Sequence, residues 1–330
     1  MASRFTGRLR DFVGRRLQHP GRWLTSNTGP GSTTMSAVLT VEELDVSIRY
    51  GGRNQPILRD INLELRKGEV HGLVGESGAG KSMLGRVILD IMPSTATIDG
   101  GRIHFNGKNW LELSKKQKRR CLGLEITLIP QDPMTSLNPV RRVKDQIEDI
   151  LQFHLKLTHS EAKDRALELL EEVHVRNPER VLRQFPHELS GGMRQRVLIA
   201  MAFCCRPTLI IADEPTTALD VSVQRQILRL IRELQINSGT SILFITHDLG
   251  VVAKICDRVS LIHTGRILES GSAEKIFGAP EHEYSRALIQ ATPRYDQPSD
   301  DLTPVPAELT ARLRNEAFTY DQRRLAKSNA

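Results

Sequence analysis

The sequence of 330 residues is 39% hydrophobic and 26% charged, enough for the core of one large α/β domain with appendages or of two small domains. Most of its net charge of +7 belongs to residues 1–34, which hold six arginines and one aspartate and therefore carry +5. The rest of the chain is nearly neutral, so the charge does not predict a nucleic-acid-binding surface. No apolar run approaches the ~18 residues that cross a bilayer, and any role at a membrane is expected to depend on another chain.

The cysteines lack the spacing of a metal site or of a catalytic disulfide. They are Cys121, Cys204, Cys205 and Cys256. Reduced thiols in the cytosol are therefore expected. We interpret the adjacent pair as small buried apolar residues rather than as a redox pair.

The basic segment 1–34 is open to three interpretations. Five apolar residues fall on one stripe of a helix flanked by arginines: Phe5, Leu9, Phe12, Val13 and Leu17. Such a stripe suits an anionic membrane surface, and the Arg-rich, acid-poor composition also resembles an organelle presequence. Prolines and glycines follow the stripe, and Met35 stands directly before the first expected strand. We therefore favour an extension without regular structure, ahead of the true start.

Strands and helices are expected to alternate from about residue 37. The segments 38–50 and 57–65 are strand-like, and the second alternates as a half-buried strand does. After a turn at 67–69, the apolar strand 70–74 leads into a glycine-rich loop. A helix over 81–91 follows and stops before Pro93.

The glycine-rich loop fits the pattern G-x-x-x-x-G-K-[ST], in which backbone N–H groups and a helix N-terminus hold nucleotide phosphates. We assign all eight of its residues to nucleotide binding: Gly75, Glu76, Ser77, Gly78, Ala79, Gly80, Lys81 and Ser82. The Lys81 ammonium is expected to reach the β- and γ-phosphates, and the Ser82 hydroxyl to bind Mg²⁺.

Helices are expected to dominate the region after residue 130. A strand over 124–129 precedes Gln131, and one helix is predicted over 143–153. A capping box formed by Thr158 and Glu161 opens another. The string Leu189-Ser-Gly-Gly-Met193 combines a tight turn with a helix to about residue 203, and alone it predicts only a loop and a helix.

Two later strands end in polar residues. The apolar strand 208–212 is followed by Asp213 and Glu214, which suit a Mg²⁺ ligand and a general base. The strand 241–245 is followed by Thr246 and His247. A lone histidine after a strand is more often structural than functional, so its role depends on what surrounds it.

The strings 75–82, 189–193 and 209–214, in this order and spacing, resemble the motifs of ATP-binding-cassette (ABC) ATPases. The resemblance covers roughly residues 37–292. It implies an α/β fold: a P-loop NTPase cassette with a RecA-like core, an antiparallel β subdomain and a helical subdomain. It also implies that two cassettes pair head to tail, each ATP being held between the loop of one and Ser190, Gly191 and Gly192 of the other.

The resemblance also implies roles in hydrolysis. Asp213, Ser82 and Gln131 would hold Mg²⁺, and Glu214 would polarise the attacking water. Lys81 and Gln131 count among the catalytic residues.

Three further positions match the family pattern. His247 stands where the family keeps a γ-phosphate-sensing histidine, and residues 218–220 match a loop that passes between the subunits. Tyr50 is the candidate for stacking the adenine ring, with an ordinary aromatic residue at a strand end as the alternative.

Within the superfamily, four strings are similar to ATPase subunits of peptide-type importers (oligopeptides, dipeptides, nickel and related solutes): 132–139, 191–196, 212–222 and 283–288. This implies a peripheral ATP hydrolase at the cytoplasmic face of the inner membrane that drives import, most simply of di- or oligopeptides. Its partners would be two transmembrane permease subunits, a second cassette (a copy or a paralogue) and, indirectly, an extracytoplasmic solute-binding protein, with no nucleic acid. Many members carry a C-terminal cysteine cluster for an iron–sulfur centre, but residues 293–330 contain no cysteine, so none is expected.

Three regions are therefore predicted: a basic extension over 1–36, an ABC ATPase domain over 37–280 with a helical subdomain at about 132–205, and a C-terminal segment over 281–330. The last is expected to end in a mobile polar tail with a short helix over 307–318. Two alternative kinds of ABC protein are disfavoured. A non-transport ABC ATPase acting on nucleic acid or ribosomes usually has two cassettes, long coiled coils or zinc modules, which this sequence lacks. A degenerate cassette is disfavoured because Lys81, Asp213, Glu214 and His247 are present.

Overall fold

A computed structural model of the chain describes residues 36–217, 219–292 and 304–328. The segment 1–34, with its three interpretations, lies outside the described residues, as does Ala218 of the predicted intersubunit loop. None of the helices in the described ranges has both the length and the apolar character needed to cross a membrane.

An antiparallel sheet of four strands forms one part of the structure, in the order β2-β1-β4-β5. Its strands are β1 (Ala37–Tyr50), β2 (Arg53–Arg66), β4 (Ala96–Phe105) and β5 (Lys108–Asn109). The strands predicted over 38–50 and 57–65 are thus confirmed, the second being longer than expected. Gly51 and Gly52, both with positive φ, make the hairpin between β1 and β2.

A second sheet has six strands in the order β10-β9-β3-β8-β7-β6, parallel except for the antiparallel edge strand β10. They are β3 (Val70–Val74), β6 (Ile126–Ile129), β7 (Leu209–Asp213), β8 (Ser241–Thr246), β9 (Arg258–His263) and β10 (Arg266–Ser272). Alternate residues of one strand enter two different cores, since side chains of a strand point to opposite faces. Ile210 and Ala212 pack on the side of the helical lobe, whereas Leu209 and Ile211 pack toward the antiparallel sheet.

Helices cover the parallel sheet, as strands buried on both faces require. They are α2 (Lys81–Ile88), α9 (Val221–Ser238), α10 (Leu249–Ile255) and α11 (Ala273–Gly278), while α3 (Lys115–Cys121) follows β5. The helix predicted over 81–91 ends earlier, because Leu89 caps it and Asp90 turns the chain with a φ of 56°.

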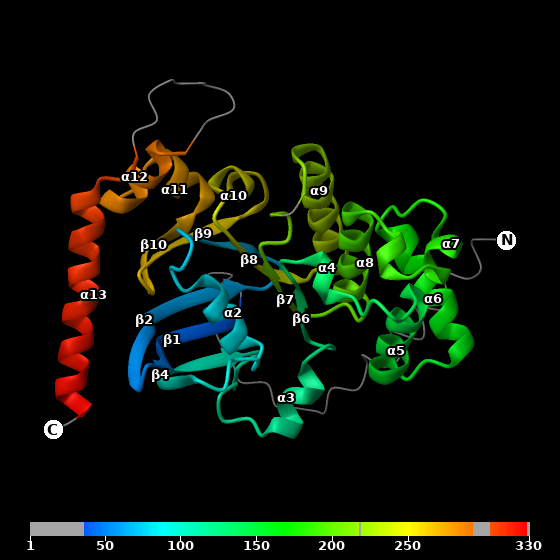
Figure 1. Cartoon of the computed structure of the whole chain (residues 1–330), viewed down its shortest axis with the longest axis horizontal. Coiled ribbons are helices and arrows are strands. Elements are labelled where there is room, and N and C mark those ends of the chain that lie inside the picture. The colour runs from blue at the N-terminus through cyan, green and yellow to red at the C-terminus, as the bar shows by residue number, and fades with distance from the viewer. Residues whose placement is uncertain (1–35, 218, 293–303, 329–330) are drawn as a thin grey trace, which may run out of the picture. The chain divides into compact units, whose positions relative to one another are not determined.

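A helical lobe lies between β6 and β7 in the chain, coloured green in Figure 1. It contains α4 (Pro133–Ser136), α5 (Val143–Leu155), α6 (His159–Glu172), α7 (Pro178–Arg183), a 3₁₀ turn (Pro186–Glu188) and α8 (Gly191–Phe203). The capping box predicted from Thr158 and Glu161 is confirmed at the start of α6. The short predicted helix over 143–153 is confirmed as α5.

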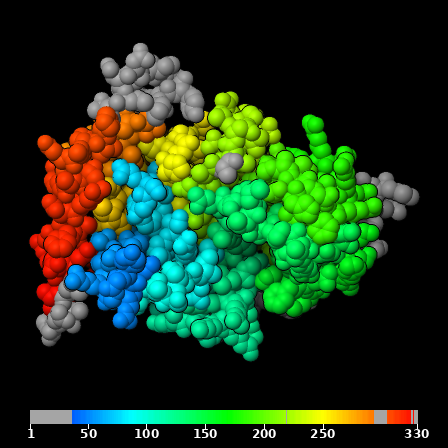
Figure 2. All heavy atoms as spheres, in the orientation of Figure 1, coloured from blue at the N-terminus to red at the C-terminus, as the bar shows by residue number. Residues whose placement is uncertain are grey.

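The C-terminal segment forms two helices, α12 (Glu283–Gln290) and α13 (Ala307–Ser328). The helix predicted over 307–318 is confirmed as α13, which begins at the predicted residue and is longer than expected. The expectation that it belongs to a mobile tail is wrong for the described residues 304–328. Leu309, Leu313 and Ala317 of α13 are buried, and the first two pack with Tyr284 of α12. Figure 2 shows α13 in red beside α12 and the blue strands of the antiparallel sheet.

Candidate functional site

The candidate site lies where four neighbouring parallel strands end. The strands β3, β8, β7 and β6 are adjacent in the sheet, and the last residues of neighbouring strands pair directly or are offset by one position. The phosphate loop follows β3, His247 follows β8, Glu214 follows β7 and Gln131 follows β6. Ligands of open α/β sheets bind at this carboxyl edge, so the fold gathers the predicted residues at one place.

The backbone of the phosphate loop leaves N–H groups without a side-chain partner at the N-terminus of α2, where an anion can bind. Gly80, with a φ of 104°, caps α2 without any side-chain hydrogen bond to the first N–H groups of the helix. Those groups are therefore available to phosphate. Gly75 permits close packing, since a Cβ there would lie 2.0 Å from the carbonyl oxygen of Ile262.

The Lys81 side chain folds back onto its own loop. Its Nζ atom donates to the carbonyl oxygens of Gly75 (2.8 Å) and Glu76 (2.9 Å). Burial lowers the pKa of Lys81, and the carboxylates of Glu214, Asp213 and Glu76 oppose that shift. The ammonium is thus desolvated and carbonyl-bound, and a bound phosphate would exchange these contacts for a stronger, charge-assisted one.

Ser82 and Asp213 form the oxygen pair to which the sequence assigned Mg²⁺. The Ser82 hydroxyl donates to Oδ1 of Asp213 over 3.0 Å. Burial raises the pKa of Asp213, against the lowering effect of the Ser82 hydrogen bond. Oxygen donors are what Mg²⁺ prefers. Among the described residues no group of three or more histidine, cysteine or acidic side chains could hold a metal.

Glu214 is the centre of the polar contacts at this edge. Its Oε1 lies 3.0 Å from Nδ1 of His247, and its Oε2 accepts from Nε2 of Gln131 (3.1 Å) and from the hydroxyl of Thr217 (2.9 Å). Because a carboxylate offers about four lone-pair sites, one on Oε1 is left for a water molecule. Gln131, also expected to bind Mg²⁺, makes its described contact with Glu214.

The charge of Glu214 is stabilised by these neighbours. Burial acts to raise the pKa of Glu214, but the hydrogen bonds from His247 and Thr217 outweigh it and leave the pKa below its ordinary value. The backbone is fixed as well: the N–H of Glu214 donates to the carbonyl oxygen of Ile245, and its φ is 46°, an uncommon value for a residue with a side chain. Glu214 is therefore held ionised in one orientation.

Thr217 is a site residue that the sequence analysis missed. It stands three residues after Glu214 and turns back to it. The spacing could have suggested the contact, because hydroxyl groups close to a carboxylate in a turn often bond to it locally.

Two groups of predicted residues lie apart from this centre. Ser190 caps α8 in the helical lobe, and within the described residues no hydrogen bond joins Ser190, Gly191 or Gly192 to the phosphate loop. Tyr50 ends β1 at the hairpin, with 73% of its surface exposed. Its ring is free to stack with a base, which the geometry permits but does not require.

Comparisons with known proteins agree with this geometry. The model of the ABC transporter family matches residues 58–217. The oligopeptide transport ATP-binding protein OppD of Bacillus subtilis is 46% identical over 290 residues, covering 86% of this chain and 81% of that protein. A probable peptide ABC transporter ATP-binding protein of Sinorhizobium fredii is 51% identical, covering 72% of this chain and 71% of its own.

A longer relative and a solved structure complete the comparison. The peptidoglycan transport ATP-binding protein YejF of Agrobacterium fabrum is 47% identical over 82% of this chain, which spans half the length of that protein. A dimeric ATP-binding cassette solved in a post-hydrolysis state, with ADP and Pi, superposes with a TM-score of 0.64 at 25% identity, over 71% of this chain and 98% of that one. The predicted α/β cassette fold is thereby confirmed. The chain therefore belongs to the ABC transporter family, as one of its ATP-hydrolysing cassettes.

Proposed function

We propose that this cassette energises the import of di- or oligopeptides through a separate membrane permease. The observation that carries the proposal is the position of the segment 131–136, which includes α4. Gln131, at the start of the segment, bonds to Glu214, and Met134, within α4, contacts the guanidinium of Arg194 in α8. One short segment thus touches both the candidate base and the helix that begins at Ser190.

The same segment faces outward. Met134 is 59% exposed, and two further apolar side chains of this region, Val140 and Phe153, are also exposed. An apolar surface of this lobe would suit contact with a partner if these side chains form one patch. A permease docked at this segment would be linked to Glu214 through the Gln131 hydrogen bond, which supports a coupling role for that glutamine.

A second cassette is part of the proposal. Ser190 and the following glycines lie at the N-terminus of α8, in the lobe rather than at the phosphate loop. That N-terminus is suited to an anion, so it would serve the ATP bound to another cassette in a head-to-tail pair. The likeness to a dimeric cassette bound to ADP and Pi supports this arrangement.

We assign the residue roles as follows, with the geometry in support. Mg²⁺ bound by Ser82 and Asp213 would neutralise charge on the phosphates. Glu214, ionised and with one lone pair free, accepts a hydrogen bond from water and orients it toward the γ-phosphate. His247, held by Glu214, is placed to bond that phosphate, and Lys81 exchanges its carbonyl contacts for the β- and γ-phosphates. Positioning of this kind supplies most of the rate in phosphoryl transfer.

The peptide class of the solute rests on the relatives. The names of these relatives describe oligopeptide, dipeptide and peptidoglycan transport, at 41–51% identity. The test is ATP hydrolysis and uptake of labelled dipeptides and longer peptides in proteoliposomes that contain the cognate permease. Stimulation by DNA, RNA or ribosomes with none by the permease would contradict the proposal.

Variants make that test specific to the docking segment. Gln131→Ala should weaken stimulation by the permease more than it weakens ATP binding, and Met134→Asp should weaken stimulation without changing basal hydrolysis. Ile236→Asp is the matched control, because Ile236 is a 65% exposed apolar residue of α9 outside the lobe. Equal losses in the control and in Met134→Asp would argue against docking at this surface.

A further inference from the structure

We propose that the C-terminal helix α13 positions the phosphate loop, with Asp321 and Arg59 as the positioning residues. The route is a chain of contacts from α13 through Arg59 of β2 to the turn between β9 and β10, and from that turn to the loop. This inference concerns ATP binding by the cassette alone, so it does not depend on the solute or on a permease.

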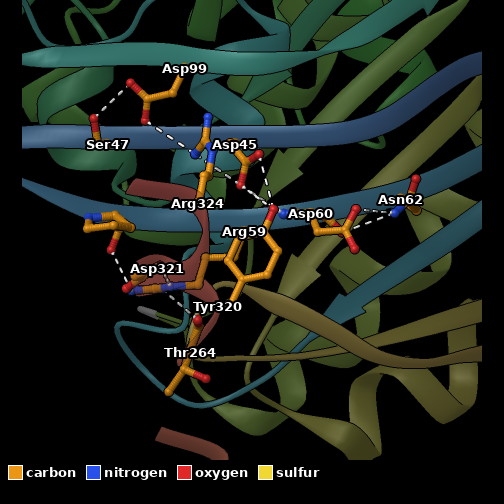
Figure 3. A network of polar contacts seen from close by, with 11 residues as sticks. Asp45, Ser47, Arg59, Asp60, Asn62, Asp99, Thr264, Tyr320, Asp321 and Arg324 are labelled. Carbon is orange, nitrogen blue, oxygen red and sulfur yellow. Dashed lines mark hydrogen bonds and ion pairs between the residues drawn. The ribbon is translucent and has the colours of Figure 1, made fainter. Parts of the chain in front are cut away.

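The first contact joins α13 to β2. The Arg59 guanidinium donates from Nε to Oδ1 of Asp321 (2.7 Å) and from Nη2 to Oδ2 (2.9 Å). The two side chains are only 14% and 13% exposed. Two parallel charge-assisted hydrogen bonds fix the plane of a guanidinium as well as its position, so Asp321 sets the orientation of Arg59 (Figure 3).

Arg59 also donates to the turn between β9 and β10, besides a bond from Nη2 to the carbonyl oxygen of Pro56 in its own strand (3.0 Å). Its Nη1 donates to the carbonyl oxygen of Thr264 (2.8 Å), and its backbone N–H donates to the carbonyl oxygen of Gly265 (2.8 Å). The turn fits closely against β2, because a Cβ at Gly265 would lie 2.0 Å from the carbonyl oxygen of Ile57. A rotated guanidinium would therefore release the turn on the side that faces α13.

The turn between β9 and β10 is itself hydrogen-bonded to the phosphate loop. The N–H of Gly265 donates to the carbonyl oxygen of Ala79 over 2.9 Å. A Cβ at Gly80 would lie 2.8 Å from Leu58 of β2. The outer wall of the loop thus consists of β2 and this turn, which are the two parts that Arg59 holds together.

A groove of about 390 Å³ lies between α13 and the loop, and it explains why the connection is indirect. Its lining includes Gly78 of the loop and Arg314 and Phe318 of α13, together with Pro56 and Arg59. The groove separates the helix from the loop at this point, and the hydrogen-bonded path through Arg59 joins them.

Other contacts keep α13 in place and make Asp321 a fixed partner. The Tyr320 hydroxyl donates to Asp45, which is only 6% exposed, and Arg324 lies 3.3 Å from the same carboxylate. Figure 3 shows these side chains next to the Arg59 cluster. Asp45 lies in β1 of the antiparallel sheet, so both contacts bind α13 to the sheet that also contains β2.

The C-terminal segment borders the loop at a second point. Tyr284 of α12 is fully buried with its ring centroid 4.6 Å from that of His263, and His263 Nδ1 lies 4.0 Å from the carboxylate of Glu76. Among the described residues neither nitrogen of the buried His263 ring has a hydrogen-bond partner. Burial, and then the charge of Glu76, raise the pKa of Tyr284. The Tyr284 hydroxyl of α12 is therefore close enough to feel the charge of Glu76, the second residue of the phosphate loop.

The test is ATP binding by the full chain carrying Asp321→Asn, which keeps the shape of the side chain and removes its charge. We expect the Kd for MgATP, measured by titration with a fluorescent analogue, and the KM for ATP to rise about fivefold or more, while kcat changes little. Such a coupling is within the usual range of 5–150-fold. Hydrogen exchange should increase at the phosphate loop and at the turn between β9 and β10.

The matched control is Arg312→Gln. Arg312 pairs with Glu283 and so ties α13 to α12 without touching Arg59. We expect its Kd for MgATP to be unchanged. An unchanged Kd for MgATP in Asp321→Asn would overturn the proposal. An equal rise of the Kd in Arg312→Gln would overturn it too, because any weakening of the docking of α13 would then have the same effect as loss of the contact with Arg59.

A second variant keeps the proposal testable if Asp321→Asn does not fold. Arg59→Lys retains a positive charge for Asp321 but loses the planar fork that reaches the Thr264 carbonyl as well. It should raise the Kd for MgATP in the same direction and increase exchange at the turn. A Kd for Arg59→Lys equal to that of the unmodified chain would contradict the proposed route.

Discussion

The Nδ1 atom of His247 lies 3.0 Å from Oε1 of Glu214, so the residues that follow the neighbouring strands β8 and β7 are directly joined. The Glu214 carboxylate is ionised, with its pKa held below the ordinary value, and can only accept. Nδ1 of His247 therefore carries the hydrogen, and Nε2 points away from Glu214. Glu214 thus orients His247, and loss of either side chain would remove the contact that holds the other.

Glu214→Gln should leave ATP binding intact and reduce turnover by ~10²-fold or more, as expected for the loss of a general base. The Glu214 carboxylate accepts hydrogen bonds from Gln131, Thr217 and His247. The amide nitrogen of a glutamine cannot accept a hydrogen bond, so at least one of these contacts would also be lost. The measurement is the steady-state ATPase rate beside ATP affinity. The exposed Glu112 provides a control, Glu112→Gln, and hydrolysis at the unmodified rate by Glu214→Gln would show that Glu214 is not the base.

Thr217→Val should move the acidic limb of the pH–rate profile to higher pH. The Thr217 hydrogen bond favours the ionised form of Glu214, so its removal lets the carboxylate take up a proton more readily and raises its pKa. Activity should therefore be lost earlier on acidification and stay close to normal in alkaline buffer. Thr216→Val is the control, because Thr216 contacts Gln224 instead of Glu214. A limb that moves to lower pH would contradict the role of Thr217.

Ser82→Ala should raise the Mg²⁺ concentration needed for half-maximal hydrolysis by about tenfold or more, since it removes a candidate ligand that also orients Asp213. Loss of the hydroxyl also removes a contribution that lowers the pKa of Asp213. The measurement is a Mg²⁺ titration at saturating ATP. An unchanged midpoint would place the metal elsewhere.

Deletion of residues 1–34 should leave ATP hydrolysis unchanged, because the cassette described here forms a compact unit that begins at Met35. The full chain and the deletion variant are compared by ATPase rate and by cosedimentation with anionic vesicles in the absence of a permease. Binding of the full chain alone would favour the amphipathic-helix interpretation. Slower hydrolysis by the deletion variant would contradict the prediction.

Local patterns in the sequence were sufficient for the parts of the site that are themselves local. The phosphate loop follows a short apolar strand and precedes a helix, and each step depends on neighbouring residues only. The strand that ends at Val74 was predicted to the residue, and the strands before Glu214 and His247 were predicted to within about one residue. Glycine geometry and alternating apolar residues act over a few positions, so they can be read without a fold.

Only the tertiary structure decided which of these ends meet. The order β3-β8-β7-β6 brings Gln131 to Glu214 across 83 positions, and α13 brings Asp321 to Arg59 across 262. The packing of α13 was not predicted from the sequence because this helix is mostly polar, although Leu309, Leu313 and Ala317 recur every four residues on one face. Three buried residues cannot stabilise a helix in isolation. Its stability comes from packing on α12 and the antiparallel sheet, and that surface exists only once the chain has folded.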